Sequence, residues 1–414
     1  MKKNCIVAQS GGPTAAINAS LAGVINGVLA SEKYDKIYGS IHGISGVFEK
    51  NFIDLTELNK KHGSQIDLLS TSPAMFLGSC RFKMPSFTED KSCYEQLFKT
   101  FEEMNVGAFF YIGGNDSMDT VDKLSRYAEE IGSDIKFAGV PKTIDNDLIN
   151  TDHTPGFGSA AKYIATTMLE IAHDTYIYDL PCVTIVEIMG RNAGWLTAAA
   201  ALARNTYNPT PQLIYLPEVA FCKESFLADV KELLKKEKNI VVAVSEGIRD
   251  KDGVYISAQN ATLDKFGHPQ LSGVGKSLEN YIKEELGIKV RSIELNIIQR
   301  CGGHLASRTD LDESIKLGEF SVKYTEEGHT GFMTSLKRRS TVPYMYDIEM
   351  APLNEIANQE KKVPREWINE AGNDVRPEIV EYMRPLIQGE VSIAYRDGLP
   401  SYIPISHLSK LEDK

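Results

Sequence analysis

One pattern recurs along the chain: a short apolar run, then a turn rich in glycine or acidic residues, then usually a helical period. Buried parallel strands read as continuous apolar runs of this kind. Strands that alternate with helices predict βαβ units, in which helices cover both faces of a parallel sheet. The pattern therefore predicts an α/β fold. The strand-to-turn pairs are CIVAQ–SGGPTAA, AFFYI–GGNDS, FAGV–PKTIDND, VTIVEI–MGRNAG, LIYL–PEV and IVVAV–SEG.

The segment after the first turn has the period of a helix packed on one side. Its apolar residues fall on one stripe, made of Ile17, Leu21, Val24, Ile25, Val28 and Leu29. In open parallel sheets, ligands bind beyond the carboxyl ends of the strands. Every polar turn of the recurring pattern follows such a strand, so we expect these turns to converge on a functional edge.

Size, charge and cysteine usage limit the function classes. A chain of 414 residues is long for one hydrophobic core and predicts two domains. The net charge of −11 argues against a nucleic-acid surface, although local cations still suit a small anionic substrate. The six cysteines form no Cys-x-x-Cys pair, as expected of reduced thiols. Without the apolar run of a signal peptide or a membrane span, the sequence predicts a cytoplasmic protein with no membrane partner.

Two glycine-rich turns are candidate phosphate sites. SGG ends at Gly12, and GGNDS repeats the arrangement after the second apolar run. Glycines let the backbone approach an anion, and the helix N-terminus presents free N–H groups. Neither turn matches G-x-G-x-x-G or a P-loop, so SGG is either a tight structural turn or a phosphate cradle. Asn115 and Asp116 either cap the following helix or also line the site.

The segment PKTIDND combines two carboxylates with a cation. Asp145 and Asp147 lie two apart, so in an extended turn they face the same side. One carboxylate beside an alcohol can act as a general base, and a second can position substrate or metal. Lys142 adds a cation suited to phosphate charge. The alternative is a solvated turn, which fits less well because the segment follows a strand that reads as buried.

Further charged residues follow other turns and strands. Each basic residue alone is more often a surface residue, but several cations, glycine turns and paired carboxylates together indicate phosphoryl transfer to a phosphorylated polyol. The residues are Arg81 in LGSCR, Arg191 in MGRNAG, Glu246 in SEG, and Arg291 and Arg300 in RSIELNIIQRCGG.

In order and spacing, SGG, LGSCR, GGNDS, PKTIDND, MGRNAG, PEV, SEG and IIQRCGG resemble the phosphofructokinase family over about residues 1–340. The resemblance implies two similar three-layer α/β domains with mainly parallel sheets. It implies a phosphoryl-donor domain of residues 1–158 with about 299–350, and a fructose 6-phosphate domain of residues 159–298 with about 351–414. The polar region after Pro352 predicts either a C-terminal helical extension or a solvated tail.

The resemblance also implies roles for individual residues. Asp145 matches the base that takes the proton from the 1-hydroxyl of fructose 6-phosphate. Thr143 and Asp147 match groups that orient this hydroxyl and the transferred phosphoryl group. Gly12 matches the glycine at the donor phosphate, and Arg81 matches an arginine that bridges phosphates.

The sugar-binding positions of the family extend this correspondence. Arg291 and Arg300 match arginines at the sugar 6-phosphate, with Arg291 expected from a neighbouring subunit, so the resemblance implies a homo-oligomer, a dimer or a tetramer. Cys182 and Ile297 stand where ATP-dependent members carry arginine and histidine, so the 6-phosphate pocket needs a further group, for which the tail is a candidate. The remaining sugar-binding positions are Met189, Gly190, Arg191 and Glu246.

Two positions separate the branches of the family. ATP-dependent members resemble one another in having glycine where this chain has Asp116 and Lys142. Glycine leaves space for the inner phosphate and the sugar of a nucleotide, whereas a carboxylate at Asp116 fills that space and repels phosphate. Lys142 supplies the cation that a compact diphosphate needs. The pair therefore resembles the diphosphate-dependent branch, which exchanges diphosphate and fructose 6-phosphate reversibly for phosphate and fructose 1,6-bisphosphate.

Other positions depart from the family pattern. Asn115 stands where aspartate commonly helps to hold Mg²⁺, and its amide oxygen can still ligate Mg²⁺ or act through water, although without the charge. Mg²⁺ remains the expected cofactor. Ala22 and Asn26 stand where allosteric ATP-dependent enzymes carry effector-binding arginines, so we expect no activation by ADP through that site.

Two alternatives stay open from the sequence. The nearest is an ATP-dependent 6-phosphofructokinase, which a donor assay distinguishes. The other is a non-catalytic regulatory subunit that binds sugar phosphate, suggested by Asn115 and the altered 6-phosphate pocket. The intact catalytic and sugar-binding residues argue against it, because a subunit without activity does not need the base. They are Asp145, Asp147, Thr143, Glu246 and Arg191.

Overall fold

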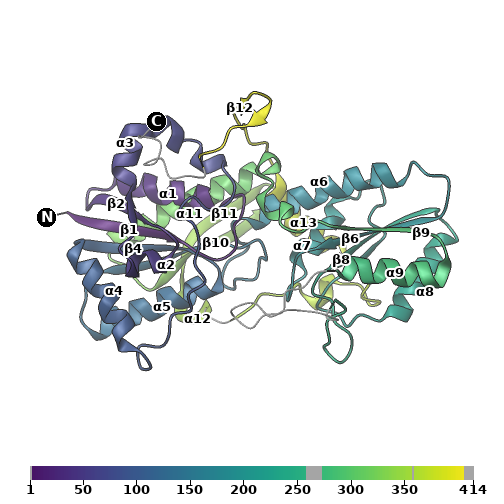
Figure 1. Ribbon diagram of the computed structural model, residues 1–414, viewed down its shortest axis with the longest axis horizontal. Coiled ribbons are helices and arrows are strands. Elements are labelled where there is room, and N and C mark those ends of the chain that lie inside the picture. Colours follow the sequence, from purple (N-terminus) through teal and green to yellow (C-terminus); the bar gives the residue numbers. More distant parts are fainter. Residues whose placement is uncertain (1, 258–272, 357–358, 405–414) are drawn as a thin grey trace.

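The computed structural model describes residues 2–257, 273–356 and 359–404. Figure 1 shows two bodies side by side, each formed by a twisted sheet with helices on its faces. The chain builds most of the first body, crosses to the second through α6 (Phe157–Thr175) and returns through α11 (Arg308–Glu326). Turns that follow strands of two different sheets can therefore meet between the two bodies.

The first body contains a seven-stranded sheet in the order β11-β10-β5-β4-β1-β2-β3. The edge strands β3 and β11 are antiparallel to their neighbours, and the strands between them pair in parallel. The strands are β1 (Lys3–Gln9), β2 (Tyr34–Ser40), β3 (Phe52–Asp54), β4 (Val106–Gly113), β5 (Lys136–Pro141), β10 (Phe332–Thr341) and β11 (Tyr344–Pro352).

Helices cover both faces of this sheet. On one face, α1 and α11 pack so closely that a Cβ on Gly23 would collide with the carbonyl oxygen of Ile315. The predicted apolar stripe of α1 is buried there, except for Leu29 in the last turn, which is exposed. The helices on this face are α1 (Ile17–Ala30), α3 (Leu55–Ile66) and α11; on the other face they are α2 (Ile44–Phe48), α4 (Lys91–Glu103) and α5 (Asn115–Glu130).

The second body contains a four-stranded sheet in the order β7-β8-β6-β9, with all pairs parallel. Three of its strands are nearly continuous apolar runs, as expected of strands buried on both faces, whereas the edge strand Lys289–Glu294 carries charged residues and is mostly not buried. The strands are β6 (Cys182–Ile188), β7 (Leu213–Tyr215), β8 (Asn239–Ser245) and β9 (Lys289–Glu294). The flanking helices are α6, α7 (Trp195–Ala198) and η2 (Ala199–Ala203) on one face, and α8 (Lys223–Leu234) and α9 (Val274–Leu286) on the other.

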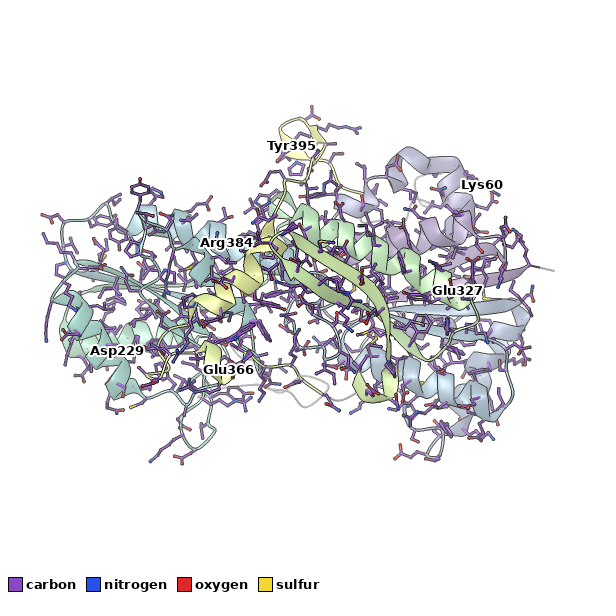
Figure 2. The ribbon with its side chains drawn as sticks, turned by 180° about the vertical axis from the view of Figure 1, so that it is seen from behind. Lys60, Asp229, Glu327, Glu366, Arg384 and Tyr395 are labelled. Carbon is purple, nitrogen blue, oxygen red and sulfur yellow. The ribbon has the colours of Figure 1, made fainter. Side chains whose placement is uncertain are left out.

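The C-terminal extension contacts both bodies. Ile379 and Met383 pack in the core beside the second sheet, whereas Ile403 packs in a core of the first. In Figure 2 the segment passes Glu366 beside the second body, Arg384 between the bodies and Tyr395 on a projecting hairpin. Its elements are α12 (Leu353–Ile356), η5 (Arg365–Trp367), α13 (Pro377–Met383), η6 (Arg384–Ile387), β12 (Tyr395–Arg396) and β13 (Leu399–Pro400); three short helices earlier in the chain are η1 (Leu69–Thr71), α10 (Ile298–Cys301) and η4 (Gly303–Leu305).

The α/β prediction, with mainly parallel sheets, is confirmed. Up to residue 404, the extension carries short helices and packs against both cores, so it is not a solvated tail. The domain division at residues 158, 298 and 350 stays a prediction. All six cysteines are free thiols. Within the described ranges, no helix combines the length and apolar character needed to cross a membrane.

Candidate active site

Three adjacent strands of the first sheet bring the predicted donor turns together. β1 pairs with β4, and β4 pairs with β5, so that Gln9 lies opposite Ile112 and Gly113 opposite Pro141. Because parallel strands end at the same edge, the turns that follow them are neighbours. SGG, GGNDS and PKTIDND therefore meet at one edge, as the sequence predicts.

The SGG turn lies against two cations. Gly11 has a left-handed backbone (φ +79°), and a Cβ there would lie 3.1 Å from the Lys142 Nζ. A Cβ on Gly12 would lie 3.3 Å from the Arg300 Nη1. Any side chain at these two positions would press on the cations, so glycine keeps the backbone accessible to an anion. The Ser79 hydroxyl donates to the Gly11 carbonyl oxygen at 2.9 Å and so ties down the loop that carries the exposed Arg81.

Lys142 is the buried cation of the site. Its side chain is 2% exposed, and its Nζ donates to the Gly12 carbonyl oxygen at 2.7 Å. Burial lowers the pKa of the Lys142 ammonium to about 7, while the carboxylate of Asp145 opposes this shift. A bound anion beside the amine would favour its charged form, so Lys142 is suited to hold a phosphate group.

Exposure alternates along the turn after Lys142. Thr143, Asp145 and Asp147 are partly exposed, whereas the residues between them are buried. This places both carboxylates on one side, as predicted from their spacing. The backbone N–H of Asp145 donates to the Thr143 Oγ1 at 3.1 Å. Burial raises the pKa of Asp145, and Lys142 and Arg191 oppose the shift. A carboxylate with a raised pKa is a stronger proton acceptor for an alcohol.

Asn115 and Asp147 form a pair beside the base. The Asn115 Nδ2 donates to Asp147 Oδ2 at 3.3 Å, and the Asn115 Oδ1 is buried without a hydrogen-bond partner among the described residues. Burial and the neighbouring Asp145 raise the pKa of Asp147 to about 7. Asp116 lies in the first turn of α5 and is exposed. Its carboxylate therefore lies at the N-terminal end of α5. The sequence predicts that this carboxylate excludes the inner phosphate of a nucleotide.

The second sheet supplies the sugar-side turn at the ends of β6 and β8. Gly190 has φ +136°; its N–H donates to Glu246 Oε1 at 3.3 Å, and its carbonyl oxygen accepts from the Ser245 hydroxyl at 2.6 Å. Burial raises the pKa of Glu246 to about 7, with Asp145 adding to the shift. The Arg191 Nε is buried without a hydrogen-bond partner in the described ranges. Arg191 lies close enough to Asp145 to oppose the rise in the pKa of this carboxyl group. Asp145 in turn lies close enough to Glu246 to raise the pKa of Glu246.

The short helix α10 adds Arg300 from the end of the second sheet. The Arg300 guanidinium lies beside Gly12 and opposes the positive charge of Lys142. The resemblance implies that Arg300 binds the sugar 6-phosphate, which stays a prediction; its guanidinium also lies next to the donor turn. Gln299, which the sequence analysis missed, accepts from the Met189 N–H at 3.2 Å. Ile297 is 54% exposed and makes no closed pocket wall.

The predicted residue Arg291 does not join the site within one chain, and neither does Cys182, which stands where ATP-dependent members carry an arginine. Arg291 pairs with Thr184 near the start of β9 and β6, several residues before the strand ends, and forms an ion pair with Asp174. Cys182 begins β6 and is buried. Both lie towards the amino ends of their strands, whereas Met189 follows the carboxyl end of β6. Within its own chain, Arg291 therefore lies away from the turn that follows β6.

Residues from the C-terminal extension were missed by the sequence analysis. Lys361 donates to Asn146 Oδ1 at 3.4 Å, and Tyr382 accepts from Asn146 Nδ2 at 3.0 Å. These contacts join residues 215 and 236 positions apart. No motif or period connects such distant positions, so the sequence offered no signal for them.

Comparison with known proteins places this geometry in a family. The sequence profile described as "Phosphofructokinase" matches residues 4–323. The chain is 41% identical over 409 residues to the pyrophosphate–fructose 6-phosphate 1-phosphotransferase of Xanthomonas campestris pv. campestris, covering 98% of this chain and 97% of the relative. It is 40% identical to the protein of the same name from Halomonas elongata, covering 96% and 94%.

A solved structure is similar over the same extent. The pyrophosphate-dependent phosphofructokinase of Nitrosospira multiformis superposes with a TM-score of 0.86 at 37% identity, covering 97% of this chain and 95% of the other. Sequence profile, relatives and structure agree over most of the chain. The chain belongs to the phosphofructokinase family.

Proposed function

We propose that the protein transfers a phosphoryl group from diphosphate to the 1-hydroxyl of fructose 6-phosphate, forming phosphate and fructose 1,6-bisphosphate. The observation that carries this proposal is the buried Lys142, whose amine lies on the Gly12 carbonyl and near Asp145. A cation at this point lies between the donor turn and the base. The near-full-length relatives act on the two substrates that their names state.

Asp145 is the proposed general base. In the transfer, the sugar O1 forms a bond to the distal phosphorus of diphosphate, the bond from that phosphorus to the bridging oxygen breaks, and Asp145 takes the hydroxyl proton. Thr143 lies within hydrogen-bond distance of Asp145 and holds its orientation. The phosphate leaves with the bridging oxygen. We propose that the reaction also runs in the opposite direction.

The donor side selects diphosphate by charge and space. The backbone of Gly12, with Lys142 and Arg81, holds the diphosphate oxygens, while Asp116 repels the inner phosphate of a nucleotide. Arg300 is proposed to bind the sugar 6-phosphate. Its Nε is buried without a hydrogen-bond partner among the described residues, and its guanidinium lies at Gly12, so it also places positive charge beside the transferred group. Charge placed where phosphoryl transfer develops charge is the main catalytic contribution of such a site.

The sugar side binds fructose 6-phosphate through the turn after β6. Met189, Gly190, Arg191 and Glu246 contact the sugar, with Ile297 at the edge of the site. The 6-phosphate is held by Arg291 of a neighbouring copy, so the active form is a homo-oligomer, a dimer or a tetramer. The position of Arg291, away from the site of its own chain, supports this arrangement.

Mg²⁺ is the proposed cofactor, and the residues present fit it. The unpartnered Oδ1 of Asn115 and the carboxylate of Asp147 lie together, and both are oxygen ligands of the type that Mg²⁺ prefers. The described residues contain no group of three His, Cys, Asp or Glu side chains that could hold a metal. This is consistent with Mg²⁺, which commonly takes one or two protein ligands together with substrate phosphates. When bound, the ion neutralises charge on the diphosphate.

Two further proposals concern regulation and location. Ala22 and Asn26 leave α1 without effector-binding arginines, so the enzyme is not activated by ADP through that position. The substrates belong to glycolysis and gluconeogenesis, and we place the enzyme in the cytoplasm.

A donor assay tests the proposed function. The purified protein is supplied with fructose 6-phosphate, Mg²⁺ and either diphosphate or ATP, and fructose 1,6-bisphosphate is measured. We expect turnover with diphosphate and at most trace turnover with ATP. Turnover with ATP alone would overturn the choice of donor, and no turnover with either would favour a regulatory subunit.

A further inference from the structure

A four-residue strap crosses behind the candidate active site. It consists of residues 360–363 and lies in the C-terminal extension between α12 and η5. The helix α12 packs beside α5. Its backbone and side chains bind turns from both sheets. The strap is absent from every motif that identified the site in the sequence.

Lys361 of the strap binds the catalytic turn and the chain that follows it. Its backbone N–H donates to the Asp147 carbonyl oxygen at 2.7 Å. Its Nζ donates to the carbonyl oxygens of Asp152 at 2.7 Å and Thr151 at 3.2 Å, and to the Asn146 Oδ1 at 3.4 Å. One residue therefore supports the turn between the base and the proposed metal ligand at several points.

Asn146 is the part of the turn that most needs this support. It lies between Asp145 and Asp147 and has φ +54°, a left-handed conformation that costs energy for a residue other than glycine. Its Oδ1 also accepts from the Thr154 N–H at 3.1 Å, and its Nδ2 donates to the Tyr382 hydroxyl at 3.0 Å. The conformation that aims both carboxylates to one side is thus fixed from behind, and its supports include two residues of the extension.

The same strap binds the sugar-side turn. Glu360 Oε1 accepts from the Asn192 Nδ2 at 2.9 Å, and the Trp195 Nε1 donates to the Lys361 carbonyl oxygen at 2.9 Å. Glu218 Oε1 accepts from the N–H groups of both Gly194 and Val363, at 2.8 and 3.0 Å. The strap therefore sets the distance between the turn that carries the base and the turn that follows the sugar-binding residues.

We propose that Lys361 is a positioning residue for phosphoryl transfer, which holds the Asp145 carboxylate in line with the sugar hydroxyl. The inference rests on the proposed function. Lys361 acts through the backbone of the turn and the Asn146 side chain, so its loss should change the alignment of the base more than the binding of either substrate. A misplacement of about 1 Å lowers a rate by about 100-fold.

The test compares two neighbouring lysines. Lys361→Met removes the ammonium and keeps the apolar stem, and Lys362→Met makes the same chemical change at an exposed side chain one residue later. We expect Lys361→Met to lower kcat per folded site by 10- to 100-fold, with both KM values within about threefold of the wild type. Lys362→Met should retain the wild-type kcat. Lys361→Arg, which still donates to carbonyl oxygens, should recover part of the loss.

A second variant covers a failure of Lys361→Met to fold. Tyr382→Phe removes one hydroxyl that bonds both Asn146 and the Asp152 carbonyl oxygen, and it keeps the buried ring. We expect a three- to tenfold lower kcat per folded site, measured below the thermal unfolding midpoint, which should itself fall because the buried Asn146 Nδ2 loses a partner.

Several outcomes would overturn the proposal. They are a wild-type kcat per folded site in Lys361→Met, equal losses in Lys361→Met and Lys362→Met, or, if Lys361→Met does not fold, a wild-type kcat in Tyr382→Phe. If the wild type uses ATP and not diphosphate, the proposed donor is wrong. The kcat values of Lys361→Met and Lys362→Met are then compared with ATP as the donor, and the same outcomes support or overturn the role of Lys361.

Discussion

The two halves of the active site differ in how they are assembled. On the donor side, three turns that directly follow adjacent strands surround Lys142, which is 2% exposed. On the sugar side, the turn after β6 is in place, but Arg291 lies towards the other end of its sheet and Ile297 is 54% exposed. Within one chain the donor turns are therefore brought together, whereas Arg291, predicted to bind the 6-phosphate, lies away from the sugar-side turn.

Loss of the base should have the largest effect, because the base serves both halves. Asp145→Asn keeps the size of the side chain and removes its ability to take a proton, so we expect kcat to fall by about 10³-fold. Turnover is measured in both directions, and binding of fructose 6-phosphate by calorimetry. Binding should persist within a few fold. Full activity would show that another group is the base.

Loss of the donor cation should come next and affect one substrate. Lys142→Met leaves the Gly12 turn without its buried amine, so we expect kcat/KM for diphosphate to fall by about 10²-fold. The KM for fructose 6-phosphate should change little. Lys136→Met, at the opposite end of β5, is the matched control. An equal rise in both KM values would contradict the division into two halves.

Loss of Arg291 should have a smaller effect, confined to the sugar half. Arg291→Met removes a charge-assisted bond to the 6-phosphate, and we expect the KM for fructose 6-phosphate to rise by about 10-fold or more. Subunits carrying Arg291→Met are then mixed with subunits carrying Asp145→Asn. If Arg291 serves a neighbouring copy, mixed oligomers contain one intact site and regain low-KM activity. Without any recovery, Arg291 does not act between copies.

The pH dependence should show the smallest effects and still separate the halves. Asp147 and Glu246, with pKa values raised to about 7, are protonated below that pH, so kcat/KM for either substrate should fall as the pH drops below 7. Lys142, with its pKa lowered to about 7, loses its charge above that pH. As the pH rises above 7, kcat/KM for diphosphate should therefore fall. The kcat should not fall with it, because bound diphosphate keeps the Lys142 amine charged.

Substitution of Lys142 by arginine sharpens this pH test. An arginine stays protonated throughout the accessible range, so the alkaline loss should disappear from kcat/KM for diphosphate. The acid loss should remain, since it comes from carboxylates. An alkaline loss that persists in Lys142→Arg would assign it to another group.

Much of the donor half could be predicted from the sequence because its residues are local to strand ends. The spacing of Asp145 and Asp147 predicted that they face one side, and the burial pattern of the turn agrees. The assignment of Arg300 to the 6-phosphate stays a prediction, but its closeness to the donor turn was not foreseen. Its guanidinium lies at Gly12, because α10 returns from the second sheet towards the first. Such a placement depends on the relative position of two sheets, which no local pattern encodes.

The sequence by itself determined the α/β class, the order of the functional turns and the family, since apolar periods and glycine turns act over a few residues. Only the tertiary structure decided how Lys361 and Tyr382 reach Asn146, more than 200 positions earlier in the chain. The physical reason is that a left-handed residue with buried polar atoms needs hydrogen-bond partners, and any segment that packs nearby can supply them. Which segment does so follows from the packing of the extension against both bodies.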